Sequence, residues 1–241
     1  MKNQGILPYI VEVTEKPEGI TAWAGLPSVL ETMRALGLDK VIGREIKLRK
    51  RRRGYSEARK VESLVLLMAA GGECVDDIRM LQADAGLCRL VGKLPSSDRL
   101  LAFLYAFHDQ GLIDRARAQL TGDRVAYIPA ENEALQGLGR VNVALVERVA
   151  RQRKCVRATL DHDATIQESH KREAQPHYKG GRGYQPSAIY WAEQDLVVAD
   201  EYRDGNVPAG MENLRLIRQG FASLPDGITE RYFRADSACY D

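Results

Sequence analysis

Long apolar stretches are missing from this sequence of 241 residues. No run reaches the length of about 18 apolar residues that a membrane-spanning helix needs. The first residues, Met1 to Pro8, also lack the basic and then apolar segments of a secretory signal. We therefore expect a cytoplasmic protein that has no membrane partner.

Cysteine is scarce as well. The sequence has four cysteines, Cys74, Cys88, Cys155 and Cys239, and none of them forms a CxxC pair. A zinc ribbon is therefore not expected, because its ligands come in such pairs. In a reducing cytoplasm these residues are expected to be small core residues or free thiols.

A large excess of charge of one sign is missing too, since the net charge is only +2. The basic residues are nevertheless concentrated between Lys47 and Arg53. Such a run either contacts nucleic-acid phosphates or forms a solvated turn between helices, and the sequence leaves both readings open. A phosphate-binding P-loop is excluded, because the spacing GxxxxGK[ST] does not occur.

Apolar residues make up 44% of the sequence, which is enough for a sizeable core. After a short strand over residues 8–13, the pattern predicts mainly helices over residues 20–120. One helix covers Leu26 to Leu36 and stops at Gly37, and the next is capped by Ser56. The inward stripe of that second helix is predicted to be Val61, Leu64, Val65, Met68 and Ala69. A shorter helix carries Val75, Ile78 and Leu81, and a further one places Leu100, Leu101, Leu104 and Phe107 on one side.

The second half has a different pattern, in which strands are predicted as well as helices. Residues 121–139 indicate a linker or surface loop, followed by a helix with Val141, Leu145 and Val149. Strands are predicted over residues 155–160, 187–192, 196–202 and 231–235, with the second and third forming a hairpin. A helix beginning near Asn206 to Pro208 separates the last two strands and is predicted to bury Met211, Leu214, Ile217 and Phe221. A mainly helical N-terminal region followed by the order strand, strand, strand, helix, strand predicts an α+β or α/β protein with a mixed sheet.

Three aspartates follow apolar strands: Asp161, Asp163 and Asp236. Because side chains alternate along a strand, Asp161 and Asp163 face the same side, and Asp236 can join them if the first and fourth strands are neighbours. Close carboxylates repel, and a divalent cation relieves that repulsion. Two such ions suit phosphodiester cleavage. The alternative is that each aspartate only ends a strand or caps a helix.

Several stretches resemble the DDE transposases of bacterial cut-and-paste insertion sequences. The segment Thr159 to Thr165 is similar to their first catalytic strand, in which an apolar run is followed by Asp, one residue and Thr. The segments Tyr178 to Pro186 and Asp204 to Pro208 resemble later signatures of one branch, and Arg234 to Asp241 resembles its second catalytic block. Gly71 to Asp77 is similar to that branch as well.

The resemblance implies a helical, DNA-binding region over residues 1–139 and an RNase H-like catalytic domain over residues 140–241. Asp163 then matches the first catalytic aspartate and Asp236 the second, while Asp161 remains a rival metal ligand. The family's third carboxylate is a glutamate on a later helix. It has no counterpart before Asp241, so the resemblance implies an incomplete domain. The implied cofactor is a pair of Mg²⁺ or Mn²⁺ ions.

The resemblance also implies a function: metal-dependent DNA cleavage and strand transfer. The partners would be double-stranded DNA, at terminal inverted repeats and target sites, and a second copy on paired ends. DNA-contacting residues are expected at Lys50, Arg51, Arg52, Arg53, Lys179 and Arg182. The alternative is a truncated, inactive protein that binds element ends and competes with the intact enzyme. A nuclease of RNA–DNA hybrids is disfavoured by the long helical half.

His162, His170 and His177 are expected to be exposed rather than zinc ligands.

Overall fold

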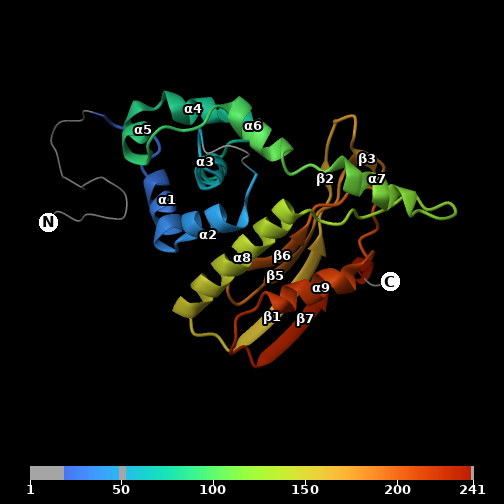
Figure 1. Cartoon of the computed structure of the whole chain (residues 1–241). Coiled ribbons are helices and arrows are strands. Elements are labelled where there is room, and N and C mark those ends of the chain that lie inside the picture. Colours follow the sequence, from blue (N-terminus) through green and yellow to red (C-terminus); the bar gives the residue numbers. More distant parts are fainter. Residues whose placement is uncertain (1–18, 49–52, 240–241) are drawn as a thin grey trace. The chain divides into compact units, whose positions relative to one another are not determined.

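The computed structural model describes residues 19–48 and 53–239, which form two compact units (Figure 1). The first unit holds the described residues up to His108 together with Glu133–Val141. The second unit holds Asp109–Asn132 and the described residues from Asn142 onward. The strand predicted over residues 8–13 lies outside the described residues. The domain boundary predicted at residue 139 stays a prediction, because compact units are defined by contacts alone. Within the described ranges, no helix has the length and apolar character needed to cross a bilayer.

The first unit is helical, as the sequence predicts. Its elements are α1 (Leu26–Ala35), α2 (Leu38–Glu45), α3 (Glu57–Ala69), the 3₁₀ turn η1 (Val75–Asp77), α4 (Ile78–Ala83), α5 (Ala85–Val91), α6 (Ser97–Tyr105) and the start of α8 (Glu133–Gln152). α2 and α5 were not foreseen. Gly37 stops α1 and opens α2 with a φ of 63°, a left-handed conformation that favours glycine. Ser56 caps α3 as predicted, because its hydroxyl accepts a hydrogen bond from the backbone N–H of Arg59 at 3.1 Å.

The core of the first unit joins these helices. Leu30 of α1, Leu66 of α3, Ile78 and Leu81 of α4, and Leu100 of α6 are all fully buried in one cluster. The predicted roles of Ile78, Leu81 and Leu100 are therefore confirmed. Leu104 is 42% exposed, so its place in the predicted stripe of α6 is wrong, and Phe103 is buried instead.

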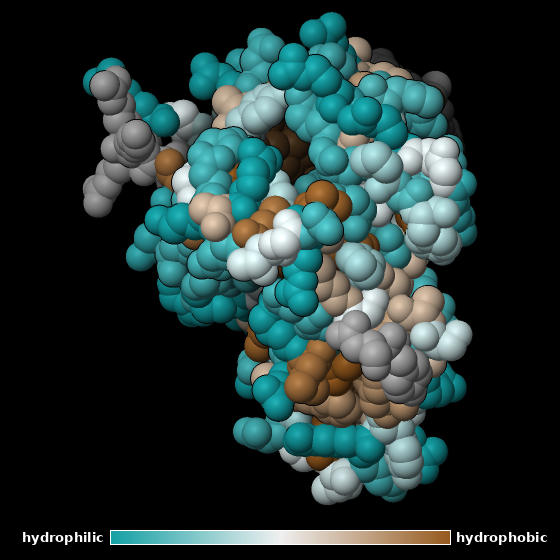
Figure 2. All heavy atoms as spheres, turned by 90° about the vertical axis from the view of Figure 1, so that its right-hand side faces the viewer, coloured by the Kyte–Doolittle hydropathy of each residue, from teal (hydrophilic) through white to brown (hydrophobic). Residues whose placement is uncertain are grey.

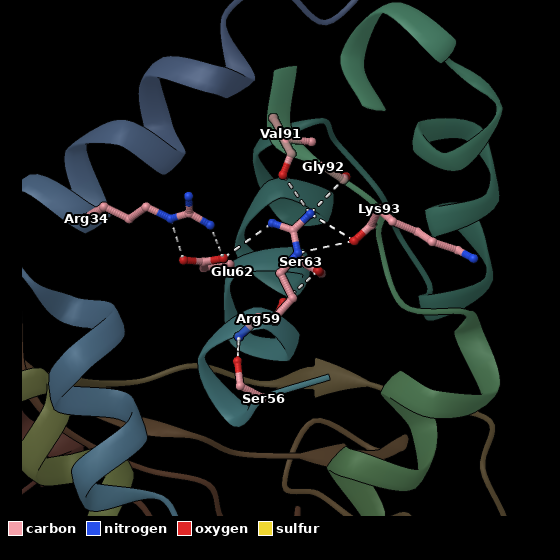
Figure 3. A network of polar contacts seen from close by, with 8 residues as sticks. All are labelled: Arg34, Ser56, Arg59, Glu62, Ser63, Val91, Gly92 and Lys93. Atoms are coloured by element: carbon pink, nitrogen blue, oxygen red, sulfur yellow. Dashed lines mark hydrogen bonds and ion pairs between the residues drawn. The ribbon is translucent and has the colours of Figure 1, made fainter. Parts of the chain in front are cut away.

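The predicted inward face of α3 is also wrong. Met68 is 75% exposed, whereas Glu62 and Ser63 are buried beside Leu66 and Leu67. The reason is an ion network, because a carboxylate enters a core when it is fully paired. The Glu62 carboxylate accepts hydrogen bonds from Arg34 at 2.9 and 3.0 Å and from Arg59 at 3.3 Å (Figure 3). The helix is rotated to place that carboxylate inside.

The second unit combines a mixed sheet with three helices and a smaller sheet. Its elements are α7 (Gln110–Ala118), the rest of α8, β1 (Arg157–Ala164), β2 (Gln167–Glu168), β3 (Gln175–Pro176), β4 (Arg182–Tyr184), β5 (Ser187–Trp191), β6 (Leu196–Glu201), α9 (Asn213–Ala222), β7 (Glu230–Ala235) and the 3₁₀ turn η2 (Ser237–Cys239). α8 begins at Glu133, inside the stretch predicted to be a linker.

The main sheet has the strand order β6-β5-β1-β7. β5 pairs antiparallel with both β1 and β6, which confirms the predicted hairpin. β7 pairs with β1 in parallel, after the crossover through α9. A helical region followed by a mixed sheet is therefore confirmed, and so is the α+β class.

The two faces of the main sheet differ. Leu160, Ile189 and Trp191 point to one side and form a core with residues of α8 and α9, which cross this face in Figure 1. The other side carries Asp161, Asp163, Val197 and Tyr232, which are half-buried or exposed. Figure 2 shows one side of the molecule, where most surface residues are hydrophilic and hydrophobic ones gather in small groups.

α9 differs from its prediction in start and rotation. It begins at Asn213 rather than near Pro208, and Leu214 is 59% exposed while Leu216 and Gly220 are buried. Asn213 points inward instead, because its side-chain amide donates to the carbonyl oxygens of Ala209 and Cys239, each at 2.8 Å. A polar anchor again sets which face of a helix is buried.

The smaller sheet lies between β1 and β5 in the sequence and has the order β2-β4-β3. The turn around Gly205 packs against it. A Cβ atom on Gly205 would lie 2.7 Å from the carbonyl oxygens of both Gln175 and Gly183. Only glycine allows this approach without a shift of the backbone.

The Glu62 network provides a test of the first unit. Glu62→Gln keeps the side-chain shape but leaves the two guanidinium groups without their shared charge partner. We expect the free energy of unfolding to fall by about 2 kcal/mol, less than the loss of about 3–5 kcal/mol for a fully buried pair. The reduction reflects the Arg34 side chain, which is 28% exposed. Urea unfolding followed by circular dichroism measures the change, with Glu73→Gln on the exposed surface as control. Equal midpoints for the two variants would show that the network adds nothing.

Candidate active site

β1 carries its aspartates within the strand rather than after it. Along Arg157–Ala164 the side chains alternate between buried and accessible, so Asp161 and Asp163 share one face while Leu160 and His162 occupy the other. The predicted common face of the two aspartates is therefore present. Asp163 is exposed and Asp161 is half-buried.

β7 brings the third aspartate to the same edge. The parallel register pairs Thr159 with Tyr232, Asp161 with Arg234, and His162 with Ala235, where it ends. The next residues are Asp163, which is still in β1, and Asp236, which directly follows the end of β7. Paired residues of neighbouring strands point to the same face. The register therefore carries Asp163 and Asp236 to adjacent positions at the ends of β1 and β7.

Thr165 holds the Asp163 side chain. Its hydroxyl donates to Oδ2 of Asp163 at 3.0 Å, and its own backbone N–H donates to the carbonyl oxygen of Pro186 at 3.0 Å. The Asp-x-Thr spacing thus places a hydroxyl where it can orient the carboxylate. The other oxygen of Asp163 has no protein partner among the contacts of the described chain.

Asp161 is engaged differently. Both of its oxygens accept hydrogen bonds from Arg234, with Nε–Oδ1 at 2.6 Å and Nη2–Oδ2 at 2.7 Å. The pair joins β1 to β7 two residues before Asp163 and Asp236. The hydrogen bonds and the charge of Asp161 raise the pKa of Arg234. Asp161 therefore already has a cationic partner.

His162 lies under the aspartates, on the buried face. Its Nε2 lies 2.6 Å from Oγ of Ser187, and its ring stacks 6.3 Å from that of Phe233. Burial and the nearby Arg203 lower the pKa of His162, whereas the negative charges of Asp163 and Asp236 act against that shift. His162 and His177 are 4% and 6% exposed, so the prediction that they are exposed is wrong, although it holds for His170. Both have found partners inside the unit, since His177 Nδ1 accepts from the N–H of Lys179 at 3.3 Å.

Cys239 is a further residue at this edge, and sequence reasoning missed it. It is buried in η2, three positions after Asp236, and its thiol hydrogen-bonds to the Asp236 carboxylate. Burial, this hydrogen bond and the charges of Asp236 and Asp163 raise the pKa of the thiol to about 12. The charges of both aspartates therefore act on the pKa of this one thiol. The only sequence feature that could have indicated its place at this edge is that it follows Asp236 by three positions.

A buried polar network supports the same region. Arg203 donates to Glu201 at 2.7 Å and to Asn213 at 3.2 Å, and Arg215 also donates to Glu201. Asn213 in turn donates to the carbonyl oxygen of Cys239. The network links the end of β6 and the start of α9 to the segment after β7. No motif in the sequence pointed to these residues, because they are scattered and polar.

The residues predicted to contact DNA lie in two places. Lys50, Arg51 and Arg52 fall outside the described residues, whereas Arg53 is exposed at the surface of the first unit. Lys179 is exposed in the second unit, with its Nζ 5.7 Å from the Tyr178 ring centre. Arg182 spends two of its N–H groups on the carbonyl oxygens of Ala174 and Arg172, at 2.8 and 3.1 Å. It holds the loop before β4 in place.

A complete metal centre is not formed by protein ligands alone. In the part of the chain that the structure describes, no group of three or more His, Cys, Asp and Glu residues is arranged to hold a metal ion. The oxygens of Asp163 and Asp236 are hard ligands of the kind that Mg²⁺ and Mn²⁺ prefer, and such ions keep several waters. The two residues therefore fit part of a divalent-cation site.

Comparison with known proteins gives one match. The family described as Transposase DDE domain group 1 matches residues 9–241 of the chain. No curated protein and no solved structure matches it. The match covers both compact units, including Asp161, Asp163 and Asp236.

The raised pKa of Cys239 gives a prediction about thiol chemistry. At pH 8, a thiol with a pKa of about 12 is ionised in roughly one molecule in ten thousand, and only the thiolate reacts. Iodoacetamide should therefore label the exposed Cys74 well before Cys239. Asp236→Asn removes a negative charge beside the thiol and should speed its labelling, whereas Asp226→Asn should not. Mass spectrometry of the digested protein measures both rates. Labelling of wild-type Cys239 as fast as Cys74 would contradict this arrangement.

Proposed function

Because the chain belongs to the Transposase DDE domain group 1 family, we propose that it is a cytoplasmic insertion-sequence transposase that cleaves and joins DNA strands. Membership of this family implies that the chain binds DNA and uses divalent metal ions. The proposal goes further, because it assigns the chemistry to particular residues. Asp163 and Asp236 are the catalytic carboxylates, and the cofactor is a pair of Mg²⁺ or Mn²⁺ ions.

The observation that supports this assignment most is the register of β1 and β7. Continued one residue beyond its last pair, His162 with Ala235, this register would bring Asp163 and Asp236 side by side, although the paired positions Asp161 and Arg234 are 73 residues apart in the sequence. Two carboxylates at such positions repel each other unless a cation lies between them. No described cation pairs with Asp163 or Asp236, whereas Asp161 is paired with Arg234. Asp163 is therefore the preferred ligand on β1, and Asp161 stays the rival.

Each nearby residue has a separate task in the proposed reaction. Thr165 fixes the orientation of the Asp163 carboxylate. The Asp161–Arg234 pair holds the two strands in register. The lowered pKa of His162 keeps its ring neutral at pH 7, so that no cation competes for the carboxylates from beneath the sheet. When bound, divalent ions would activate the attacking water or 3′-hydroxyl and neutralise charge on the phosphate.

DNA would be held by basic residues outside the carboxylate site. We propose Arg53 and the run Lys50, Arg51 and Arg52 in the first unit, and Lys179 and Arg182 in the second. Lys179 is exposed and can reach a phosphate, whereas Arg182 can donate only the N–H groups that it does not spend on Ala174 and Arg172. The DNA partners are the terminal inverted repeats and the target site, with two copies of the protein on paired ends.

One observation favours a second candidate function. Of the three aspartates at this edge, Asp161 is already paired with Arg234, and no group of three or more His, Cys, Asp and Glu residues in the described chain is arranged to hold a metal ion. A protein with an incomplete ligand set would bind DNA ends without cutting them. It would then compete with an active transposase instead of acting as one.

Metal binding and cleavage separate these candidates. We expect Asp163→Asn and Asp236→Asn each to weaken Mn²⁺ binding at least about tenfold, because each removes a charged ligand and even indirect ligand partners contribute about tenfold. Asp226→Asn, in an exposed turn, is the matched control. Mn²⁺ affinity is measured by electron paramagnetic resonance, and cleavage by the nicking of supercoiled DNA.

The outcomes divide clearly. Loss of both Mn²⁺ binding and nicking in the two variants, with the control unchanged, supports the transposase. Mn²⁺-independent DNA binding without nicking by the wild-type protein supports the competitor. Wild-type Mn²⁺ affinity in both variants would remove Asp163 and Asp236 from the mechanism. A loss confined to Asp161→Asn would transfer the role to that residue.

A further inference from the structure

A groove in the first unit is lined by basic residues of α3 and α6 and of the loops before each helix. It consists of two adjoining hollows that share Gly54, Tyr55 and Arg99. The first hollow also has Arg53, Lys60 and Phe103 on its walls, and the second has Lys93, Leu94 and Ser96. We refer to these two hollows together as the basic groove.

The charge of the groove has one sign. Its cationic residues are Arg53, Lys60, Lys93 and Arg99, and none of the described residues that line it is an aspartate or a glutamate. Asp98 and Glu57 belong to the same two helices but do not line the groove. Like charges that line one groove repel one another, and an anion bound there would offset this repulsion.

The wall that carries Lys93 is rigidly held. The Arg59 side chain donates to the carbonyl oxygens of Val91, Gly92 and Lys93 at 2.8, 2.9 and 3.0 Å (Figure 3). From the other side, Gln82 donates to the carbonyl oxygens of Leu94 and Pro95 at 3.3 and 3.0 Å, and the Tyr55 hydroxyl donates to Leu94 at 3.3 Å. Because Arg59 is itself fixed by the buried Glu62, the loop is ordered before any ligand binds. Such preorganisation lowers the entropic cost of binding.

Two of the cations are available for a ligand. Lys93 and Arg99 are exposed, and neither forms a side-chain ion pair within the described ranges. The Lys60 ammonium group lies 5.0 Å from the ring centre of Phe103, and both residues line the first hollow. The groove thus presents positive charge along its length, rather than in a single point that would suit one small anion.

We propose that the basic groove binds the phosphate backbone of duplex DNA, with Lys93 and Arg99 as direct phosphate contacts. The proposal rests on the proposed function, because a member of a transposase family is expected to bind DNA, which is a polyanion. The repeated negative charge of a DNA strand matches a row of cations along a groove, and an arginine fork suits phosphate oxygens. Contacts of this kind give affinity and position without reading the base sequence.

The salt dependence of DNA binding tests the groove. Each lost phosphate contact lowers the slope of log affinity against log salt by about 0.9. The variant Lys93→Ala/Arg99→Ala should therefore lower the magnitude of the slope by about 1.8. The control Lys40→Ala/Arg89→Ala removes the same charge from exposed positions that do not line the groove. Fluorescence anisotropy with a short labelled duplex of mixed sequence, in EDTA and over a range of salt, gives the slopes.

Because binding is measured without metal, this test is independent of cleavage. A smaller slope for the groove variant and an unchanged slope for the control support the groove, whether or not any protein nicks DNA. An unchanged slope for the groove variant, with circular dichroism showing that it is folded, overturns the groove even if Asp163 and Asp236 prove essential for nicking. Equal losses in both variants would mean that only total charge matters and would also overturn it. So would a wild-type protein that binds the duplex without any dependence on salt.

Discussion

The parallel pairing of β1 with β7 is the constraint on which the proposed active site depends. β1 alone holds two aspartates on one face, but a carboxylate pair at the sheet edge requires the second strand in one particular register. The bidentate contact between Asp161 and Arg234 spans the two strands next to that position. A slip of one residue would turn Asp236 to the opposite face, because side chains alternate along a strand. The ion pair therefore has a structural task beside a site that is proposed to be catalytic.

Both compact units use the same device to place a polar group inside. In the first unit, Glu62 is bound by Arg34 and Arg59, and in the second, Glu201 is bound by Arg203 and Arg215. In each case an arginine of the cluster also holds a neighbouring segment: Arg59 holds the loop of Lys93, and Arg203 reaches Asn213 of α9. Arginine suits this role because its donors are spread over a plane.

The sequence was sufficient to predict the features that depend on local patterns. The capping of α3 by Ser56, the β5–β6 hairpin and the order of β1, β5, β6, α9 and β7 follow from turn residues and apolar periodicity, whereas the short strands β2, β3 and β4 were not predicted. The inward faces of α3 and α9 could not be predicted, because Glu62 and Asn213 are buried through partners distant in sequence. The position of Cys239 beside Asp236 and the burial of His162 likewise depend on tertiary contacts. Apolar periodicity assumes that polar residues face water, and these residues do not.

The crossover between β1 and β7 also bears on when the site can form. Arg234 and Asp161 are 73 positions apart, and the smaller sheet, the β5–β6 hairpin and α9 all lie between them. Chains are synthesised from the N-terminus, and contacts that close long loops form late. The hairpin can already pair with β1 while β7 is still inside the ribosome. On a nascent chain Asp163 would thus stand without Asp236, and the proposed metal site could form only after β7 has left the ribosome.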